Sequence, residues 1–225
     1  MSVASWEGAK ICWFQRSYES PALLVLLKLL FSSQPLPSLR PLCREPAHYE
    51  QLLAYAGTVF QNCGNFLSFG DTKFVPELPA EDFLHILRQS ECYKTHAPVV
   101  EDIWPKIEKE VYCSEDPFRQ LGFRDNNGTT SYYSGDLTST DAKRVDDLLT
   151  TLGISPLNTR LFKLGEHEFE LRIASAEAST EKMPYLKTHE SEGLKVHVKA
   201  GDFKEFMAKT VQAFEQSQHY VANET

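Results

Sequence analysis

The sequence lacks the features of a nucleic-acid-binding, secreted or membrane-spanning protein. Its 23 basic residues are outnumbered by 31 acidic ones, giving a net charge of −8, so there is no basic excess to neutralise phosphates. The five cysteines are odd in number and contain no Cys-x-x-Cys pair, which favours reduced, mostly buried thiols. The apolar run 21–31 contains Lys28 and is too short to cross a bilayer. We therefore expect a cytoplasmic protein with neither a nucleic-acid nor a membrane partner.

Two common catalytic motifs are also missing. His167-Glu168 begins a zinc-helix pattern, but Leu171 and Arg172 stand where the second histidine would be needed. Ser68 precedes Phe69-Gly70 as in the second half of a Gly-x-Ser-x-Gly elbow, yet Phe66 occupies the first glycine position. The sequence thus predicts no catalytic residue and no bound metal in this chain.

The first half of the chain is predicted to be helical. The run 21–31 is apolar nearly all round, which predicts a helix that is covered on most sides. In 48–61 apolar residues recur on one stripe at helical spacing. The segment 33–46 carries four prolines and is predicted to be a non-helical connector. Leu78-Pro79-Ala80-Glu81 is expected to open another helix, with the proline at an early position. A further helix is expected over 99–112, where Pro105 should kink it.

The second half mixes short strands with two helices. Alternating patterns predict strands at 130–134, 158–163, 168–175 and 193–199, the second and third forming a hairpin. A capping box from Thr138 to Asp141 opens a helix that ends at Gly153. Asp202 and Glu205 are expected to cap the last helix. Its inward residues would be Phe203, Phe206, Met207, Val211 and Phe214.

These patterns predict an α+β fold: helices first, then a small mixed or antiparallel sheet with two packed helices. We divide the chain into a mainly helical part, 1–124, and an α+β part, 125–225. The stretch 176–187, rich in Ala, Ser and Glu, is predicted to be a flexible excursion.

The most informative segment is the loop 62–76, which contains Gly64-Asn-Phe-Leu-Ser-Phe-Gly-Asp-Thr-Lys-Phe74. It follows neither a helical nor a strand period, so specific contacts must order it. In one interpretation it is a packed connector, with Phe66, Phe69 and Phe74 in the core. In the other, four residues line a cleft and bind an extended peptide: Asn65, Ser68, Phe69 and Gly70.

This loop resembles the Gly-Asn-Tyr-x-Ser-Phe-Gly-Asp-Thr-Lys-Phe-x-Pro segment of the dipeptidyl peptidase III family, with Phe66 in place of the tyrosine. Other stretches resemble the family in the same order along the chain. They are Trp6-x-Gly8, Tyr132-Tyr-Ser-Gly135, Asp141-Ala-Lys143, Asn158-Thr-Arg-Leu-Phe-Lys163, Arg172-Ile-Ala-Ser175 and Tyr220-x-Ala-Asn223.

The resemblance implies a two-lobed cytosolic zinc peptidase that releases dipeptides from the amino ends of short peptides. It also implies a partly barrel-like substrate-side lobe for this chain, with Ser68, Phe69 and Gly70 at cleft-lining positions; Asn65 is added for its proximity. The family's zinc motif, His-Glu-x-x-x-His, is absent from the sequence. The expected partners are therefore short peptides and a separate catalytic lobe that carries the zinc.

Two other interpretations stay open at this point. The chain could be a standalone, non-catalytic peptide-binding module, or an inactive truncated product.

Overall fold

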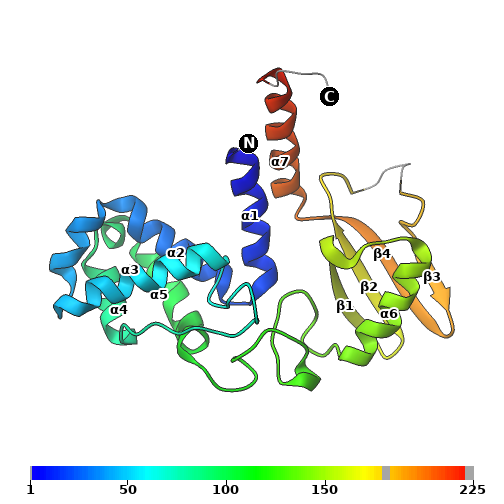
Figure 1. Cartoon of the computed structure of the whole chain (residues 1–225), viewed down its shortest axis with the longest axis horizontal. Coiled ribbons are helices and arrows are strands. Elements are labelled where there is room, and N and C mark those ends of the chain that lie inside the picture. Colours follow the sequence, from blue (N-terminus) through cyan, green and yellow to red (C-terminus); the bar gives the residue numbers. More distant parts are fainter. Residues whose placement is uncertain (1, 179–182, 221–225) are drawn as a thin grey trace. The chain divides into compact units, whose positions relative to one another are not determined.

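The computed structural model describes residues 2–178 and 183–220, and these form two compact units (Figure 1). The helical unit comprises residues 16–122 and 127–129. The sheet unit comprises the described residues of 1–15, 123–126 and 130–225. The chain passes between the units after residues 15, 122, 126 and 129, and its first 15 residues group with the sheet unit.

The helical unit contains four α-helices and a 3-10 helix among its described residues. They are α2 (Ser20–Ser33), η1 (Leu36–Leu42), α3 (Pro46–Asn62), α4 (Ala80–Gln89) and α5 (Glu91–Tyr112). The predicted helix 21–31 is present as α2, and one face of it is completely buried, through Leu23, Leu26, Leu27 and Leu30. The cover is less extensive than its all-round apolar sequence predicts, because Val25 is 41% exposed. The Phe83 and Trp104 rings pack edge to face at 5.1 Å between α4 and α5.

Two predictions for this unit are wrong in detail. The proline-rich connector is mostly helical, because η1 accommodates Pro37 near its start and Pro41 inside it. The non-helical backbone in α5 lies at His96, before Pro98, and not at Pro105. A proline ring disturbs the turn that precedes it, and Pro98 does so here.

The sheet unit is built on a mixed four-stranded sheet with strand order β1-β2-β4-β3. The strands are β1 (Thr159–Gly165), β2 (Glu168–Ala174), β3 (Thr188–Ser191) and β4 (Leu194–Asp202). β2 is antiparallel to β1 and parallel to β4, while β3 is antiparallel to β4. The α+β class is confirmed, whereas the barrel-like form is not: the described strands make an open sheet.

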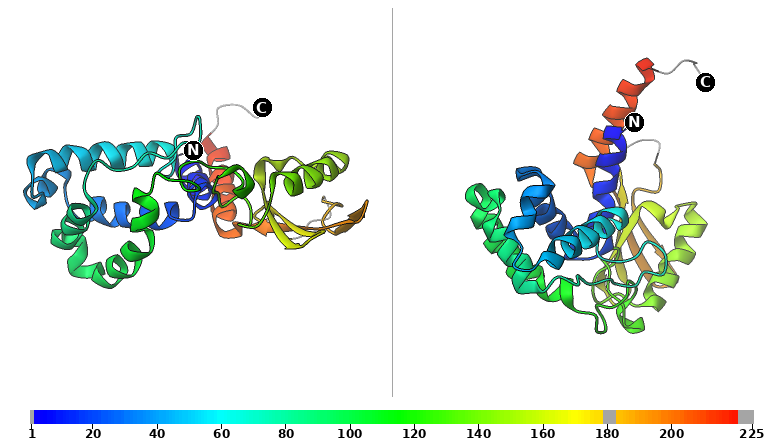
Figure 2. Two further views of the ribbon diagram at one scale, coloured as in Figure 1. Left: turned by 90° about the horizontal axis from the view of Figure 1, so that it is seen from below. Right: turned by 60° about the vertical axis from the view of Figure 1, so that its left-hand side comes forward.

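Helix α6 (Ser139–Leu152) covers one face of this sheet (Figure 2). Val145 and Leu149 of α6 lie in one buried cluster with Phe169, Leu171 and Val196 of the strands. The predicted capping box is confirmed at Thr138 and Asp141, and Gly153 ends the helix in a left-handed conformation with φ 68°. The described residues also form three short 3-10 turns: η2 (Arg124–Asn126), η3 (Pro156–Asn158) and η4 (Gln218–Tyr220).

The last helix, α7 (Lys204–Ser217), begins differently from the prediction. Its N-cap is Phe203 in a left-handed conformation, without a side-chain cap. Asp202 belongs to β4 and accepts two hydrogen bonds from Arg160, at 2.6 and 2.7 Å, so its carboxylate is engaged elsewhere. The predicted inward face is wrong as well, since α7 has no buried residue and Val211 and Phe214 are exposed. The N-terminal end of α7 packs on α1 (Ser2–Arg16), and the centres of the Phe14 and Phe206 rings are 5.5 Å apart.

Other predictions were partly wrong or fall outside the described residues. Residues 130–134 form no regular strand; only Tyr133 makes a bridge, parallel to Leu161. Of the five cysteines only Cys92 is buried, and Cys12 is exposed, so the predicted general burial is wrong. Two predictions fall partly outside the described residues. Residues 179–182 of the predicted flexible segment 176–187 are not described, and neither are residues 221–223 of the family-like stretch 220–223.

No single helix in the described ranges combines the length and apolarity needed to cross a membrane. Helices α2 and η1 reach the required length and apolarity only when they are taken together, and the chain bends by 101° between them.

Candidate functional site

The loop 62–76 begins with an abrupt reversal at the end of α3. Cys63 adopts a left-handed conformation with φ 54°, and its N–H donates to the Val59 carbonyl. Gly64 follows with φ 147°, and a Cβ on it would lie 2.5 Å from the Ser20 hydroxyl oxygen. Only glycine fits this close approach of the loop to the start of α2.

The loop then folds into a short hairpin. Phe66 and Lys73 pair as an antiparallel bridge, and the Leu67 N–H donates to the Thr72 carbonyl at 2.9 Å. Phe74 closes the base by donating its N–H to the Asn65 carbonyl at 3.1 Å. Residues 68–71 are therefore left as the tip of a hydrogen-bonded turn.

A second chain segment supports the outer side of this hairpin. The Lys73 N–H donates to the Arg119 carbonyl at 2.8 Å, and the Leu121 N–H donates to the Asp71 carbonyl at 2.9 Å. Thr129 continues the ladder by donating its N–H to the Gln120 carbonyl at 3.0 Å. The loop is thus held by backbone pairing on both sides, which limits its motion.

Lys73 fixes the hairpin from inside the helical unit. Its ammonium group is almost completely buried, lies 3.3 Å from a Glu19 carboxylate oxygen and donates to the Glu110 carbonyl. The same group lies 5.0 Å from the centre of the Phe66 ring, within the range of a cation–π interaction. A buried charge needs partners of this kind, so Lys73 ties the loop to α2 and α5 together.

The tip presents Ser68, Phe69 and Gly70 to solvent. Phe69 is 94% exposed, although a phenyl ring normally avoids water. The Ser68 N–H donates to the Asn62 side-chain oxygen at 2.8 Å, and the Ser68 hydroxyl accepts from Arg16 at 3.0 Å. The interpretation of the loop as a packed connector therefore fits Phe66, which is completely buried, but not Phe69.

Asn65 lies apart from the other three predicted site residues. Its side chain is completely buried, and neither amide atom has a hydrogen-bond partner among the described residues. It lies close to the Tyr55 hydroxyl, whose pKa burial raises well above its ordinary value. The structure therefore brings Ser68, Phe69 and Gly70 together at the surface and places Asn65 behind them in the interior.

Three supporting residues were not singled out from the sequence: Arg16, Asn62 and Lys73. Arg16 lies 52 positions before Ser68, and no sequence pattern connects the two. Asn62 directly precedes the loop and its side-chain amide donates to the Thr58 carbonyl, so a cap-forming residue there could have been considered. Lys73 stands within the loop motif, but a lysine in a polar stretch is ordinarily exposed.

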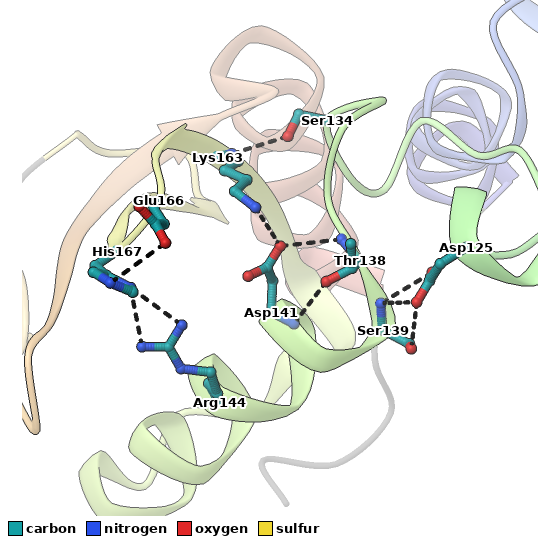
Figure 3. Close-up of polar contacts among 9 residues, drawn as sticks. All are labelled: Asp125, Ser134, Thr138, Ser139, Asp141, Arg144, Lys163, Glu166 and His167. Carbon is teal, nitrogen blue, oxygen red and sulfur yellow. Dashed lines mark hydrogen bonds and ion pairs between the residues drawn. The ribbon is translucent and has the colours of Figure 1, made fainter.

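The described residues do not provide a zinc site. No three side chains of His, Cys, Asp or Glu converge in the ranges 2–178 and 183–220. His167, which begins the partial zinc-helix pattern, lies 3.9 Å from Glu166 and 3.4 Å from an Arg144 nitrogen (Figure 3). A cationic guanidinium beside the imidazole opposes the binding of a metal cation.

Comparison with known proteins decides the family. A sequence model of peptidase family M49 matches residues 103–225, more than half of the chain. The chain belongs to peptidase family M49. The resemblance to dipeptidyl peptidase III is thereby confirmed, and the M49 relatives extend it over the loop, which lies before the matched range.

Two M49 relatives illustrate the extent of the similarity. Dipeptidyl peptidase 3 of Dictyostelium discoideum is 36% identical over 225 residues, which is 100% of this chain and 31% of that protein. Dipeptidyl peptidase 3 of Homo sapiens is 35% identical over 238 residues, covering 99% of this chain and 32% of that protein. The chain thus spans about a third of the length of the curated relatives it matches.

Proposed function

We propose that this chain is the substrate-side part of a dipeptidyl peptidase III-like zinc peptidase, which releases dipeptides from the amino ends of short peptides. The observation that carries the proposal is the exposed Phe69 on a loop that is otherwise fixed by buried contacts. Similarity to dipeptidyl peptidase 3 proteins over essentially the whole chain supports the reaction class.

The tip of the loop offers complementary contacts to an extended peptide. The Phe69 ring provides an apolar surface for a peptide side chain. The Ser68 oxygen accepts from Arg16, so its hydroxyl hydrogen can donate to a peptide carbonyl. Gly70 has no side chain, and a Cβ built on it would meet nothing within 4 Å, so a peptide backbone can approach closely. Asn65 contributes from the interior, by supporting the hairpin base.

In this proposal the zinc and the groups that cleave the peptide belong to a second lobe. That lobe is the protein partner of this chain, short peptides are its ligands, and the protein works in the cytoplasm. The chain by itself binds no zinc tightly and contributes no catalytic residue. Two alternatives remain, a standalone peptide-binding module and an inactive truncated product.

Peptide titration tests the role of the loop. A short peptide titrated into the purified chain should bind, and Phe69→Ala should raise the Kd about tenfold, because an apolar contact of roughly 1.5 kcal/mol is lost. Leu157→Ala is the matched control, since Leu157 is also a strongly exposed apolar residue but lies in the sheet unit. Equal affinity for the wild type and Phe69→Ala would contradict the assignment of the loop.

An activity assay separates the three interpretations. The chain alone, supplied with zinc and an oligopeptide, should release no dipeptide, whereas addition of a separately expressed M49 catalytic lobe should restore release. Peptide binding without such restoration favours the standalone module, and the absence of both favours the inactive product. Dipeptide release by the chain alone that a chelator abolishes would refute the proposal.

A further inference from the structure

The sheet unit contains a cavity of about 390 Å³ that the loop 62–76 does not contribute to. It lies between α6, β1 and three residues that precede α6, namely Phe123, Tyr132 and Tyr133. Its size is at the lower end of the range for small-molecule pockets. Three of the stretches that resemble dipeptidyl peptidase III meet here, through Tyr132 and Tyr133, Ala142 and Lys143, and Thr159 and Leu161.

The inner wall of the cavity is apolar and aromatic. Val145 and Leu149 of α6 and Leu171 of β2 line it, and all three belong to the buried core of the unit. The Phe123 and Tyr133 rings stack with their centres 4.6 Å apart. Such a surface suits an apolar or aromatic side chain.

Two exposed residues of opposite charge, Lys143 and Asp146, also line the cavity. Neither forms an ion pair or hydrogen bond with any residue in the described part of the chain. They are three positions apart on α6, so their side chains leave the same face of the helix. Asp146 also lies near the Tyr133 hydroxyl, whose pKa is raised by burial and by this carboxylate. An ammonium group and a carboxylate at one cavity are complementary to a ligand that carries both charges.

Polar contacts fix the first turn of α6 next to the cavity (Figure 3). Asp125 accepts hydrogen bonds from the Ser139 N–H and hydroxyl at 3.1 and 2.7 Å, which lower the pKa of Asp125. Lys163 donates to Asp141 at 2.7 Å and thereby joins β1 to the first turn of α6. The cavity is therefore preorganised, which reduces the entropy lost when a ligand binds.

We propose that this cavity binds a short zwitterionic peptide, a dipeptide with an apolar or aromatic side chain. The side chain enters the apolar wall between α6 and Tyr133. The peptide carboxylate pairs with Lys143, and its ammonium group pairs with Asp146. The proposal does not depend on peptide binding at the loop 62–76.

The test is a titration of the purified chain with the dipeptide Leu-Phe, followed by NMR of the backbone amides. The amide signals of Ala142, Val145 and Tyr133 should shift. Lys143→Gln and Asp146→Asn should each raise the Kd about three- to tenfold. Asp147→Asn is the matched control, because this neighbouring carboxylate lines a different surface of α6. Phe69→Ala should leave this binding unchanged, which separates the two sites.

A second probe isolates the contribution of the terminal charges. The same dipeptide with an acetylated amino end and an amidated carboxyl end should bind at least tenfold more weakly. The proposal is overturned if the blocked dipeptide binds equally well, if the pocket signals do not shift, or if Lys143→Gln and Asp146→Asn both bind like Asp147→Asn.

Discussion

At the scale of single residues, the candidate site depends on groups that do not touch the solvent. Lys73 and Glu19 are buried beneath the tip, and Gly64 allows the loop to lie against Ser20. The aperiodic sequence singled out this loop, but it left open whether Phe69 lies in the core or at the surface, and it grouped the buried Asn65 with the exposed Ser68 and Gly70. The burial of Lys73 was not predictable, because it results from the meeting of α2, α5 and the hairpin, which are distant in sequence.

Replacement of Lys73 by methionine should destabilise the helical unit strongly. The Glu19 carboxylate would be left buried without its cation, at a cost of about 3–5 kcal/mol. The measurement is urea unfolding followed by the fluorescence of Trp104, the tryptophan of this unit. Lys106→Met, which removes an exposed ion pair with Asp102, is the control and should cost less than about 0.5 kcal/mol.

The double variant Lys73→Met with Glu19→Gln checks the mechanism. It should recover part of the stability, because no charge is then left unpaired. If Lys73→Met is no more harmful than Lys106→Met, the buried pair does not hold the loop.

Two glycine-to-alanine substitutions should change the free energy of unfolding in opposite directions. Gly64→Ala forces a side chain onto Ser20 at φ 147° and should cost about 1–3 kcal/mol. Gly57→Ala lies within α3, where a Cβ meets nothing within 4 Å, and should stabilise by about 0.5–1 kcal/mol. Thermal unfolding of the two variants measures both, and a neutral Gly64→Ala would contradict the close approach.

At the scale of helices and strands, local signals were sufficient where one segment determines its own structure. The capping box at Thr138 and the hairpin of β1 and β2 depend on neighbouring residues, and both were predicted. The proline effects in η1 and α5 are local errors, whereas others occur where a distant partner intervenes. Asp202 could not be recognised as a strand residue, because it pairs with Ala174 of β2, and its carboxylate binds Arg160, which is 42 positions away. The strand β3 was missed for a similar reason, since its short polar sequence forms a strand only by pairing with β4.

Helices α4 and α5 are joined by a polar contact that should respond to pH. Two hydrogen bonds from Arg88, with a further one from Tyr93, hold the pKa of Glu101 at about 2, below the ordinary 4.5. A lowered carboxyl pKa stabilises the folded state above about pH 4.5, and this contribution is lost as the pH falls toward 2. In an NMR titration, the Glu101 carboxyl carbon should still be ionised at pH 3.5. In Arg88→Gln it should titrate closer to pH 4.5, whereas an unchanged midpoint would show that the contact does not persist in solution.

At the scale of the whole molecule, the chain consists of two compact units, each with its own buried residues. Sequence patterns gave the order of helices and sheet and the family, but not the assignment of residues 1–15 to the sheet unit. That assignment arises from the packing of Phe14 on Phe203 and Phe206 of the distant C-terminal part, and a single sequence holds no signal for such a pairing.

Separate cores predict separate unfolding transitions in calorimetry. Lys73→Met should lower only the transition of the helical unit. Leu149→Ala removes a buried side chain between α6 and the sheet. It should lower only the transition temperature of the sheet unit, because that unit loses about 2–5 kcal/mol of its free energy of unfolding. A single transition that both variants shift equally would show that the units unfold as one.

The route of the backbone bears on any attempt to dissect the protein. The polypeptide leaves the helical unit after Gly122, returns to it for Asn127–Thr129 alone, and leaves again. There Thr129 pairs beside Leu121, and a Cβ on Gly128 would collide with the Gly122 backbone at 2.6 Å. No single cut can therefore yield both units intact. A fragment that ends at residue 122 loses residues 127–129, which pair with Leu121 in the helical unit. A fragment that begins at residue 123 lacks α1, on which α7 packs. A circularly permuted gene that rejoins the original ends is the more promising route to an isolated sheet unit.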